Sequence, residues 1–259
     1  MKMKILLFIS FIIIIIFLIY LTTIDKEVYY LNISIEENEN SYDKYICNYL
    51  EEKQKLERYI TGYIDSNDRV TDLINIIDEN KSIKINNQNQ AIKNSLIKAD
   101  LVTIFIGLND INYKIGYSNI NELYNYADSF LEDLEEMLKI VREYCKEDII
   151  LIGYYNIYGS YYDEYFDYIN REAELICKDY DIEFISSFEI YDSDKHIDNI
   201  LLNKQENKII SEKIIEVKEE KVEVKVEEVT EDLSKKTVAE LKAMAKDAKV
   251  ENLRCWYRW

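Results

Sequence analysis

Segments of strand length and of helix length alternate along the chain, and this alternation is the feature that most limits its fold. Short runs of branched apolar residues predict strands at 28–33, 59–64, 101–106, 149–154 and 182–185. Apolar residues at helical spacing predict helices at 42–54, 70–79, 91–98, 120–146, 162–180 and 206–215. Such an alternation predicts an α/β fold in which a largely parallel, doubly wound sheet carries helices on both faces.

The first 26 residues have a different character. Lys2 and Lys4 precede an apolar run at 5–24, and a helix of about 17 to 20 residues spans roughly the 30 Å core of a bilayer. No Ala-x-Ala pattern follows the run, so we expect 1–26 to be an uncleaved membrane anchor, with a cleaved signal as the alternative. The two lysines favour a single-pass topology with the main domain outside the cytoplasm, although Lys26 weakens the asymmetry.

Charge and cysteine usage exclude some functions. The net charge of −18 disfavours binding of nucleic acid by the body of the protein. The four cysteines are widely spaced and His196 is the single histidine, so we expect no metal site and no cofactor. Cys145 and Cys177 fall in predicted helices and are expected to be small core residues, while a disulfide stays open.

Two segments follow the body, which we place at 27–215. Residues 216–232 repeat Glu, Lys and Val and are expected to form a charged linker, either extended or helical. Segment 233–259 begins a helix with Thr237 and Glu240 at capping-box spacing, and about twenty of its residues resemble the first helix of the Rho termination factor N-terminal domain. Its basic character leaves a weak nucleic-acid interaction open for this tail.

The stretch "IFIGLNDI" places polar residues directly after a predicted buried strand. Because ligands bind at the carboxyl ends of parallel strands, Gly107, Asn109 and Asp110 are expected to border a pocket. The alternative is that Asn109 or Asp110 only caps the next helix.

The same stretch resembles the third conserved block, Gly-x-Asn-Asp, of the SGNH or GDSL-type hydrolases, which are esterases and lipases. The resemblance covers about residues 27–217. It implies a three-layer α/β/α fold with a flavodoxin-like sheet. It also implies a serine nucleophile, a histidine base oriented by an aspartate, and an oxyanion site built from a serine amide, a glycine amide and the asparagine side chain.

The other blocks depart from the family pattern. In the Gly-Asp-Ser block, Ser34 is present, but Asn32 and Ile33 replace the two residues before it. Asn67 falls at the glycine of the second block, where its side chain is expected to crowd the substrate loop. In the Asp-x-x-His block, Asp198 is present, but Leu201 occupies the histidine position.

The resemblance gives Ser34, Asn109, Asp198 and, by a shift of the loop, His196 as candidate catalytic residues. Asp192 or Asp194 is a further candidate to orient that histidine. Candidate substrate-binding residues are Gly107, Asn67, Tyr155 and Asn156, within a tyrosine-rich segment that follows a strand. Because a leucine cannot accept a proton, we expect a binding protein for an acylated lipid or glycan with little esterase activity. The alternative is an active serine esterase.

Overall fold

The computed structural model describes residues 27–36, 38–115, 118–191 and 202–235. Its compact unit is Glu27–Glu216. The predicted anchor, the loop with Asp198 and Leu201, and nearly all of the predicted tail lie outside the described residues. Across the described part of the chain, none of the helices combines the length and apolar character needed to cross a membrane.

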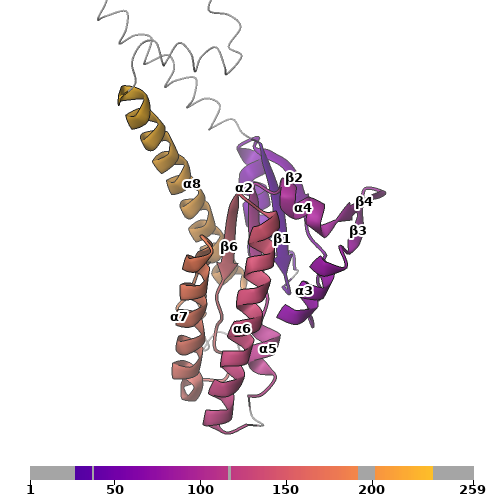
Figure 1. Cartoon of the computed structure of the whole chain (residues 1–259), viewed down its shortest axis with the longest axis vertical. Helices are drawn as coiled ribbons and strands as arrows, with labels where there is room; N and C mark the ends of the chain where they lie inside the picture. The colour runs from indigo at the N-terminus through magenta and orange to yellow at the C-terminus, as the bar shows by residue number, and fades with distance from the viewer. Residues whose placement is uncertain (1–26, 37, 116–117, 192–201, 236–259) are drawn as a thin grey trace, which may run out of the picture. The chain divides into compact units, whose positions relative to one another are not determined.

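A parallel five-stranded sheet forms the centre of the unit (Figure 1). Its strand order is β2-β1-β5-β6-β7. Its strands are β1 (Val28–Ser34), β2 (Leu56–Ile60), β5 (Leu101–Phe105), β6 (Asp148–Ile152) and β7 (Glu183–Ile185). The predicted strands at 28–33, 101–106 and 149–154 are parallel neighbours, as expected. Counted among themselves, the five strands have the 2-1-3-4-5 order of flavodoxin-like sheets.

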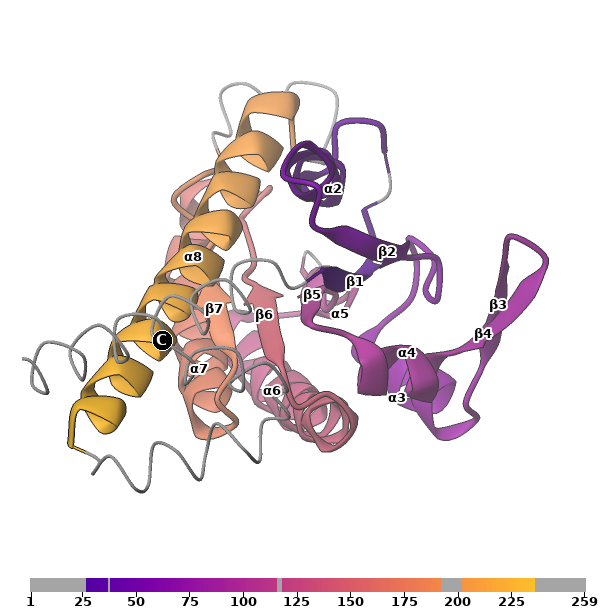
Figure 2. The same ribbon diagram turned by 90° about the horizontal axis from the view of Figure 1, so that it is seen from above.

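Helices cover both faces of the sheet, so the predicted α/β architecture is confirmed (Figure 2). Helix α2 and the first turns of α8 lie over one face, and α3, α4, α6 and α7 lie over the other. The bounds are α2 (Tyr42–Glu52), α3 (Val70–Asp78), α4 (Ile92–Lys98), α6 (Ile120–Tyr144), α7 (Asp163–Asp179) and α8 (Lys204–Lys235). A short 3-10 helix, η1 (Ser160–Tyr162), precedes α7.

Three elements differ from the sequence prediction. Strand β2 ends at Ile60, earlier than predicted, because the chain turns at Gly62, whose φ is +89°. The hairpin of β3 (Ser82–Ile85) and β4 (Gln88–Ala91) was not predicted, although Asn86 and Asn87 between its strands both have positive φ, as hairpin turns require. The third is α5 (Leu108–Asn112), a short helix directly after β5.

Helix α8 is longer than the predicted helix at 206–215 and runs through the predicted linker at 216–232. Of the two conformations expected for that segment, the helical one is therefore present. Within the compact unit, Asn207, Ile210 and Ile214 are fully buried and hold the start of α8 against the body.

The core consists mainly of apolar side chains from the sheet and the helices around it. Every residue of β1 and β5 is buried, as expected of parallel strands covered on both faces. Cys145 and Cys177 are fully buried core residues, as predicted, and Cys47 is also buried. These three cysteines are free thiols.

Candidate active site at the carboxyl ends of the central strands

Ser34 is the last residue of β1 and pairs with Phe105, the last residue of β5. Its side chain closes a tight local turn. The Oγ donates to the main-chain carbonyl of Glu36 at 3.0 Å and accepts from the Glu36 N–H at 3.0 Å. Ser34 is only 2% exposed. The candidate nucleophile is therefore at the expected end of the strand, but its proton is engaged by a main-chain oxygen.

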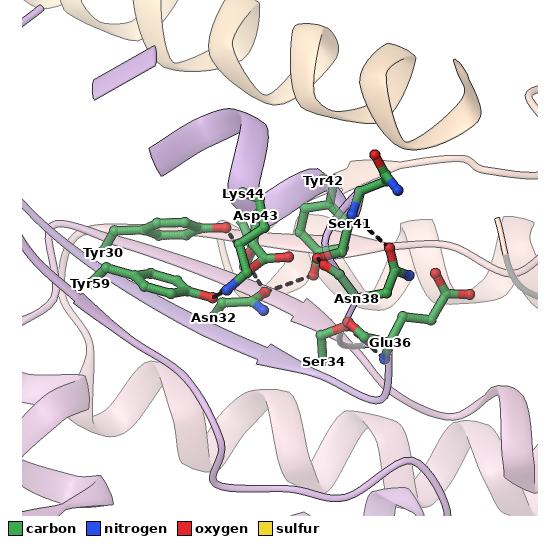
Figure 3. Close-up of polar contacts among 12 residues, drawn as sticks. Tyr30, Asn32, Ser34, Glu36, Asn38, Ser41, Tyr42, Asp43, Lys44 and Tyr59 are labelled. Carbon is green, nitrogen blue, oxygen red and sulfur yellow. Dashed lines mark hydrogen bonds and ion pairs between the residues drawn. The ribbon is translucent and has the colours of Figure 1, made fainter. Parts of the chain in front are cut away.

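A buried hydrogen-bond network lies behind Ser34 (Figure 3). The Tyr42 hydroxyl and the Thr103 hydroxyl both donate to Asn32 Oδ1, at 2.8 and 2.9 Å. Thr103 also shares a hydrogen bond of 2.8 Å with the Tyr30 hydroxyl. Asn32 is fully buried and its Nδ2 has no partner among the described residues. Thus Asn32, which replaces the glycine of the family's first block, fills space with a polar side chain.

Tyr42 stays a neutral hydrogen-bond donor in this network. Its burial raises the pKa of the phenol, Asp43 raises it further, and the hydroxyls of Ser34 and Thr103 counteract this only in part. Its main-chain N–H donates to Asn207 Oδ1 at 2.9 Å, so the first turn of α2 is attached to α8 as well. The phenol therefore keeps its proton at any physiological pH and holds α2 over the end of β1.

Asp43 continues the polar contacts toward β2 (Figure 3). Its Oδ2 accepts from the Tyr59 hydroxyl in a short hydrogen bond and lies 3.3 Å from the Lys44 ammonium. Asp43 is 1% exposed, and its other carboxylate oxygen has no hydrogen-bond partner in the described part of the chain. Burial, followed by the charge of Asp43, raises the pKa of Tyr59. These contacts attach α2 to the edge strand.

Glu36 connects the end of β1 to the end of β6. Its Oε1 accepts from the Tyr155 hydroxyl at 2.6 Å and from the Leu202 N–H at 3.4 Å. Burial raises the pKa of Tyr155 well above its usual value, and the Glu36 carboxylate adds to the shift. Leu202 follows the segment 192–201, which carries the predicted base loop. Glu36 therefore holds the chain directly after that segment beside the Ser34 turn.

Gly107 makes the turn from β5 into α5. Its φ is +107°, and a Cβ there would lie 2.8 Å from the Phe130 ring and 2.9 Å from the Tyr154 hydroxyl. Glycine is therefore required both by the backbone conformation and by the space available.

Asn109 does not direct its amide into an open site. Its Nδ2 donates to the carbonyl oxygens of Ser66 and Asp68, each at 2.9 Å. A side-chain amide has two N–H donors, and both are used here. Asn67 lies between the two acceptor residues and is exposed, so these hydrogen bonds join the segments of the second and third blocks.

Asp110 is 6% exposed and accepts from the N–H of Val70 at the start of α3, at 3.2 Å. Burial raises the pKa of this carboxyl to about 6, although the Val70 bond and the Arg69 charge oppose the shift. Asp110 therefore joins α5 to α3. The expected capping of the next helix is not present, because the N-cap of α5 is Gly107 and no side chain caps it.

The remaining candidates have structural contacts. Tyr155 is fully buried, with its ring stacked on Phe105 at 6.1 Å. Asn156 uses its amide within the loop after β6, donating to Gly159 O at 2.8 Å and Asp163 Oδ1 at 2.7 Å. His196, Asp198 and Leu201 lie outside the described residues, so no base can be assigned beside Ser34.

Glu36, Tyr42 and Thr103 are among the residues of this region that sequence reasoning did not find. Glu36 had one available signal, because it is a charged residue two positions after a serine at the end of a buried strand. For Tyr42 and Thr103 the sequence gives no such signal, because they contact Asn32 only through the packing of α2 and β5 on β1. Within the residues that the structure describes, no cluster of His, Cys, Asp or Glu side chains could hold a metal ion.

Comparison with known proteins agrees with this fold. The sequence pattern of the GDSL-like Lipase/Acylhydrolase family matches residues 25–214. The solved structure of Axe2, an acetylxylan esterase from Geobacillus stearothermophilus, is similar with a TM-score of 0.53 at 16% identity, over 72% of this chain and 91% of that chain. An acetyl xylan esterase named AlAXEase has a TM-score of 0.54 at 14% identity, over 73% and 98%. These structures share the fold. The curated proteins contain no match to the sequence.

Proposed function

Because the chain belongs to the GDSL-like lipase/acylhydrolase family, we propose that it binds an acylated glycan or acylated lipid and hydrolyses it slowly or not at all. The similar solved structures are named as acetylxylan esterases, which favours an acetylated polysaccharide among these ligands. A likeness of fold does not transfer the rate of the reaction, since activity depends on individual side chains.

The observation that carries the proposal is the engagement of Asn109. In the family this side chain stabilises the oxyanion, and removing one such donor from an active enzyme costs about 10² to 10³ in kcat. Here both of its N–H groups donate to the carbonyls of Ser66 and Asp68. The hydrogen bond from Ser34 to the Glu36 carbonyl and the leucine at position 201 support the same conclusion.

An active serine esterase is the second candidate. It is favoured by the position of Ser34, which still ends β1 directly beside the end of β5, where the third block begins. In this case His196 would serve as the base, oriented by Asp192, Asp194 or Asp198, and Asn109 would have to release at least one of its carbonyl partners on substrate binding.

Hydrolysis of p-nitrophenyl acetate separates the two candidates. We expect the detergent-solubilised full-length protein to react no faster than its Ser34→Ala variant, and to be retained on acetylated xylan. The matched control is Ser129→Ala, which removes an exposed serine on α6. Hydrolysis abolished by Ser34→Ala and unchanged by Ser129→Ala would establish the esterase, and its loss in His196→Ala would identify the base. Absence of both hydrolysis and retention would remove both candidates.

We also propose that residues 5–24 anchor the protein in a bilayer with its main domain outside the cytoplasm. The support is the length of the apolar run and the two lysines before it. The protein is then expected to stay with membranes through an alkaline carbonate wash. Release into the soluble fraction with a new N-terminus after Thr23 would contradict the anchor.

A further inference from the structure

A cavity with a mixed polar and apolar lining lies between the edge strand β2 and the β3–β4 hairpin. Its volume is about 310 Å³, which falls at the lower end of the range for small-molecule sites. Strand β2 contributes Glu57, Arg58 and Tyr59, and the hairpin contributes residues from both of its strands. Of the candidate-site network, only Tyr59 is also among the residues that line this cavity. It is therefore a separate site.

The hairpin lines the cavity with the amide side chains of Gln88 and Gln90. Gln90 is only 8% exposed, yet the described part of the structure gives its side chain no hydrogen bond. Its main-chain carbonyl accepts from the Tyr63 hydroxyl at 3.0 Å, which fixes the strand in place. The amide atoms of Gln90 are not among the buried side-chain atoms that lack a partner, so they keep some contact with solvent and can donate to and accept from a ligand in the cavity.

Two further side chains that line the cavity also lack a partner among the described residues. Gln88 and Arg58 are exposed there, and neither side chain has a hydrogen bond or ion pair with another described residue. Together with Gln90 they present several N–H donors and two amide oxygens toward one space. Ile85 adds an apolar surface beside them.

The charges at the cavity determine which ligand fits. Glu57 and Arg58 balance each other, and the chain as a whole carries a charge of −18, so an anion would not be attracted. An extended peptide paired with the edge of β2 is disfavoured, because charged side chains on a short edge strand protect it from strand pairing. Here the strand has five residues, and its exposed positions include Glu57 and Arg58.

We propose that this cavity binds an uncharged sugar unit of a glycan. Sugar hydroxyls both donate and accept, as the amides of Gln88 and Gln90 do, and the C–H face of a sugar ring can pack on Ile85. The proposal does not depend on catalysis or binding at Ser34.

Saturation-transfer-difference NMR on the full-length protein in a non-glycosidic detergent tests this site, with xylobiose and cellobiose as probes. We expect saturation transfer to at least one disaccharide and about tenfold weaker binding in Gln90→Ala and in Gln88→Ala, the loss of about one hydrogen bond. The matched control is Asn89→Ala, because Asn89 lies between the two glutamines, is exposed and does not line the cavity. It should bind as the wild type does.

Gln88 is exposed, so its replacement tests the site even if Gln90→Ala impairs folding. No saturation transfer to either disaccharide would overturn the proposal, as would equal binding by Gln88→Ala and Asn89→Ala. Binding that is lost in Ser34→Ala but kept in Gln88→Ala would assign the sugar to the candidate active site instead. Stronger saturation transfer to glucuronate than to the neutral sugars would contradict the uncharged class.

Discussion

The Tyr155 hydroxyl donates to Glu36 Oε1 at 2.6 Å and so connects the chain after β6 to the chain after β1. Glu36 is 1% exposed and Tyr155 is fully buried. The carboxylate also accepts from the Leu202 N–H, so one side chain joins three segments at the carboxyl edge of the sheet. A buried carboxylate tolerates the loss of such a donor poorly.

We therefore expect Tyr155→Phe to lower the free energy of unfolding by about 1–3 kcal/mol, the cost of taking one hydrogen-bond donor away from a buried acceptor. The phenylalanine ring can keep the stacking on Phe105 and on Tyr191, whose ring centre lies 4.7 Å away, so the packing term is preserved. Denaturant unfolding measures the difference. The control is Tyr158→Phe, at a residue that is 41% exposed, and equal losses in the two variants would contradict the role given to Glu36.

The second prediction concerns the loop held by Asn109. Asn109→Ala removes both hydrogen bonds to the carbonyls of Ser66 and Asp68. We expect a loss of about 1–2 kcal/mol in the free energy of unfolding and faster amide hydrogen exchange in residues 66–70. Asn125→Ala, on the exposed face of α6, is the control. If exchange in the loop does not change, the loop is held by other contacts and Asn109 is free for an oxyanion role.

The sequence predicted the central strands β1, β5 and β6 well because they are buried on both faces, and such strands are short apolar runs. The runs at 28–33, 101–106 and 149–154 needed no tertiary information to be found. Strand β2 was placed too late, because its exposed Glu57 and Arg58 hide it while the apolar Tyr63 and Ile64 after the turn resemble a strand. An edge strand is partly exposed, so it lacks the continuous apolar run that identifies a central, fully buried strand.

The candidate site was only partly predictable. The family motif located Ser34 and Asn109, and the structure brings their segments to one edge of the sheet. What the motif could not give is the direction of each hydrogen bond, which depends on the folded loop. The amide of Asn109 turns toward Ser66 and Asp68, and Glu36 contacts Tyr155, which lies 119 residues away in the chain. Both contacts depend on packing between distant segments, which a local sequence pattern does not contain.

The third prediction concerns Gly107. Gly107→Ala combines backbone strain at a φ of +107° with a Cβ that would meet Phe130 and Tyr154 at 2.8 to 2.9 Å. We expect a loss of about 2–5 kcal/mol from the two effects together. Gly62→Ala is the matched control, since its φ is +89° but nothing lies within 4 Å of its Cβ position. Only the strain of about 1–2 kcal/mol should appear there. Thermal or denaturant unfolding of both variants compares them, and equal losses would show that the space at Gly107 is less restricted than the contacts indicate.

The last prediction concerns pH and Asp110, whose pKa is raised from 3.8 to about 6, first by burial. The groups that face it oppose or add to this shift: the Val70 N–H and the Arg69 charge lower the pKa, and Asp133 of α6 raises it. Because the folded state holds the proton more tightly than the unfolded state, this carboxyl favours folding below about pH 4. That contribution is lost as the pH rises from 4 through 6.

The comparison is with Asp110→Asn, which cannot ionise but can still accept from the Val70 N–H. As the pH falls from 7 to 4, the wild type should gain about 2 kcal/mol in the free energy of unfolding relative to the variant, since one pKa unit corresponds to about 1.36 kcal/mol. Urea unfolding of both proteins across this range measures the difference and cancels the contributions of all other carboxyls. The prediction is wrong if the difference between wild type and variant stays constant with pH, or if the wild type loses stability relative to the variant on acidification. Either result would mean that Asp110 is ionised in the folded protein and better solvated than its burial indicates.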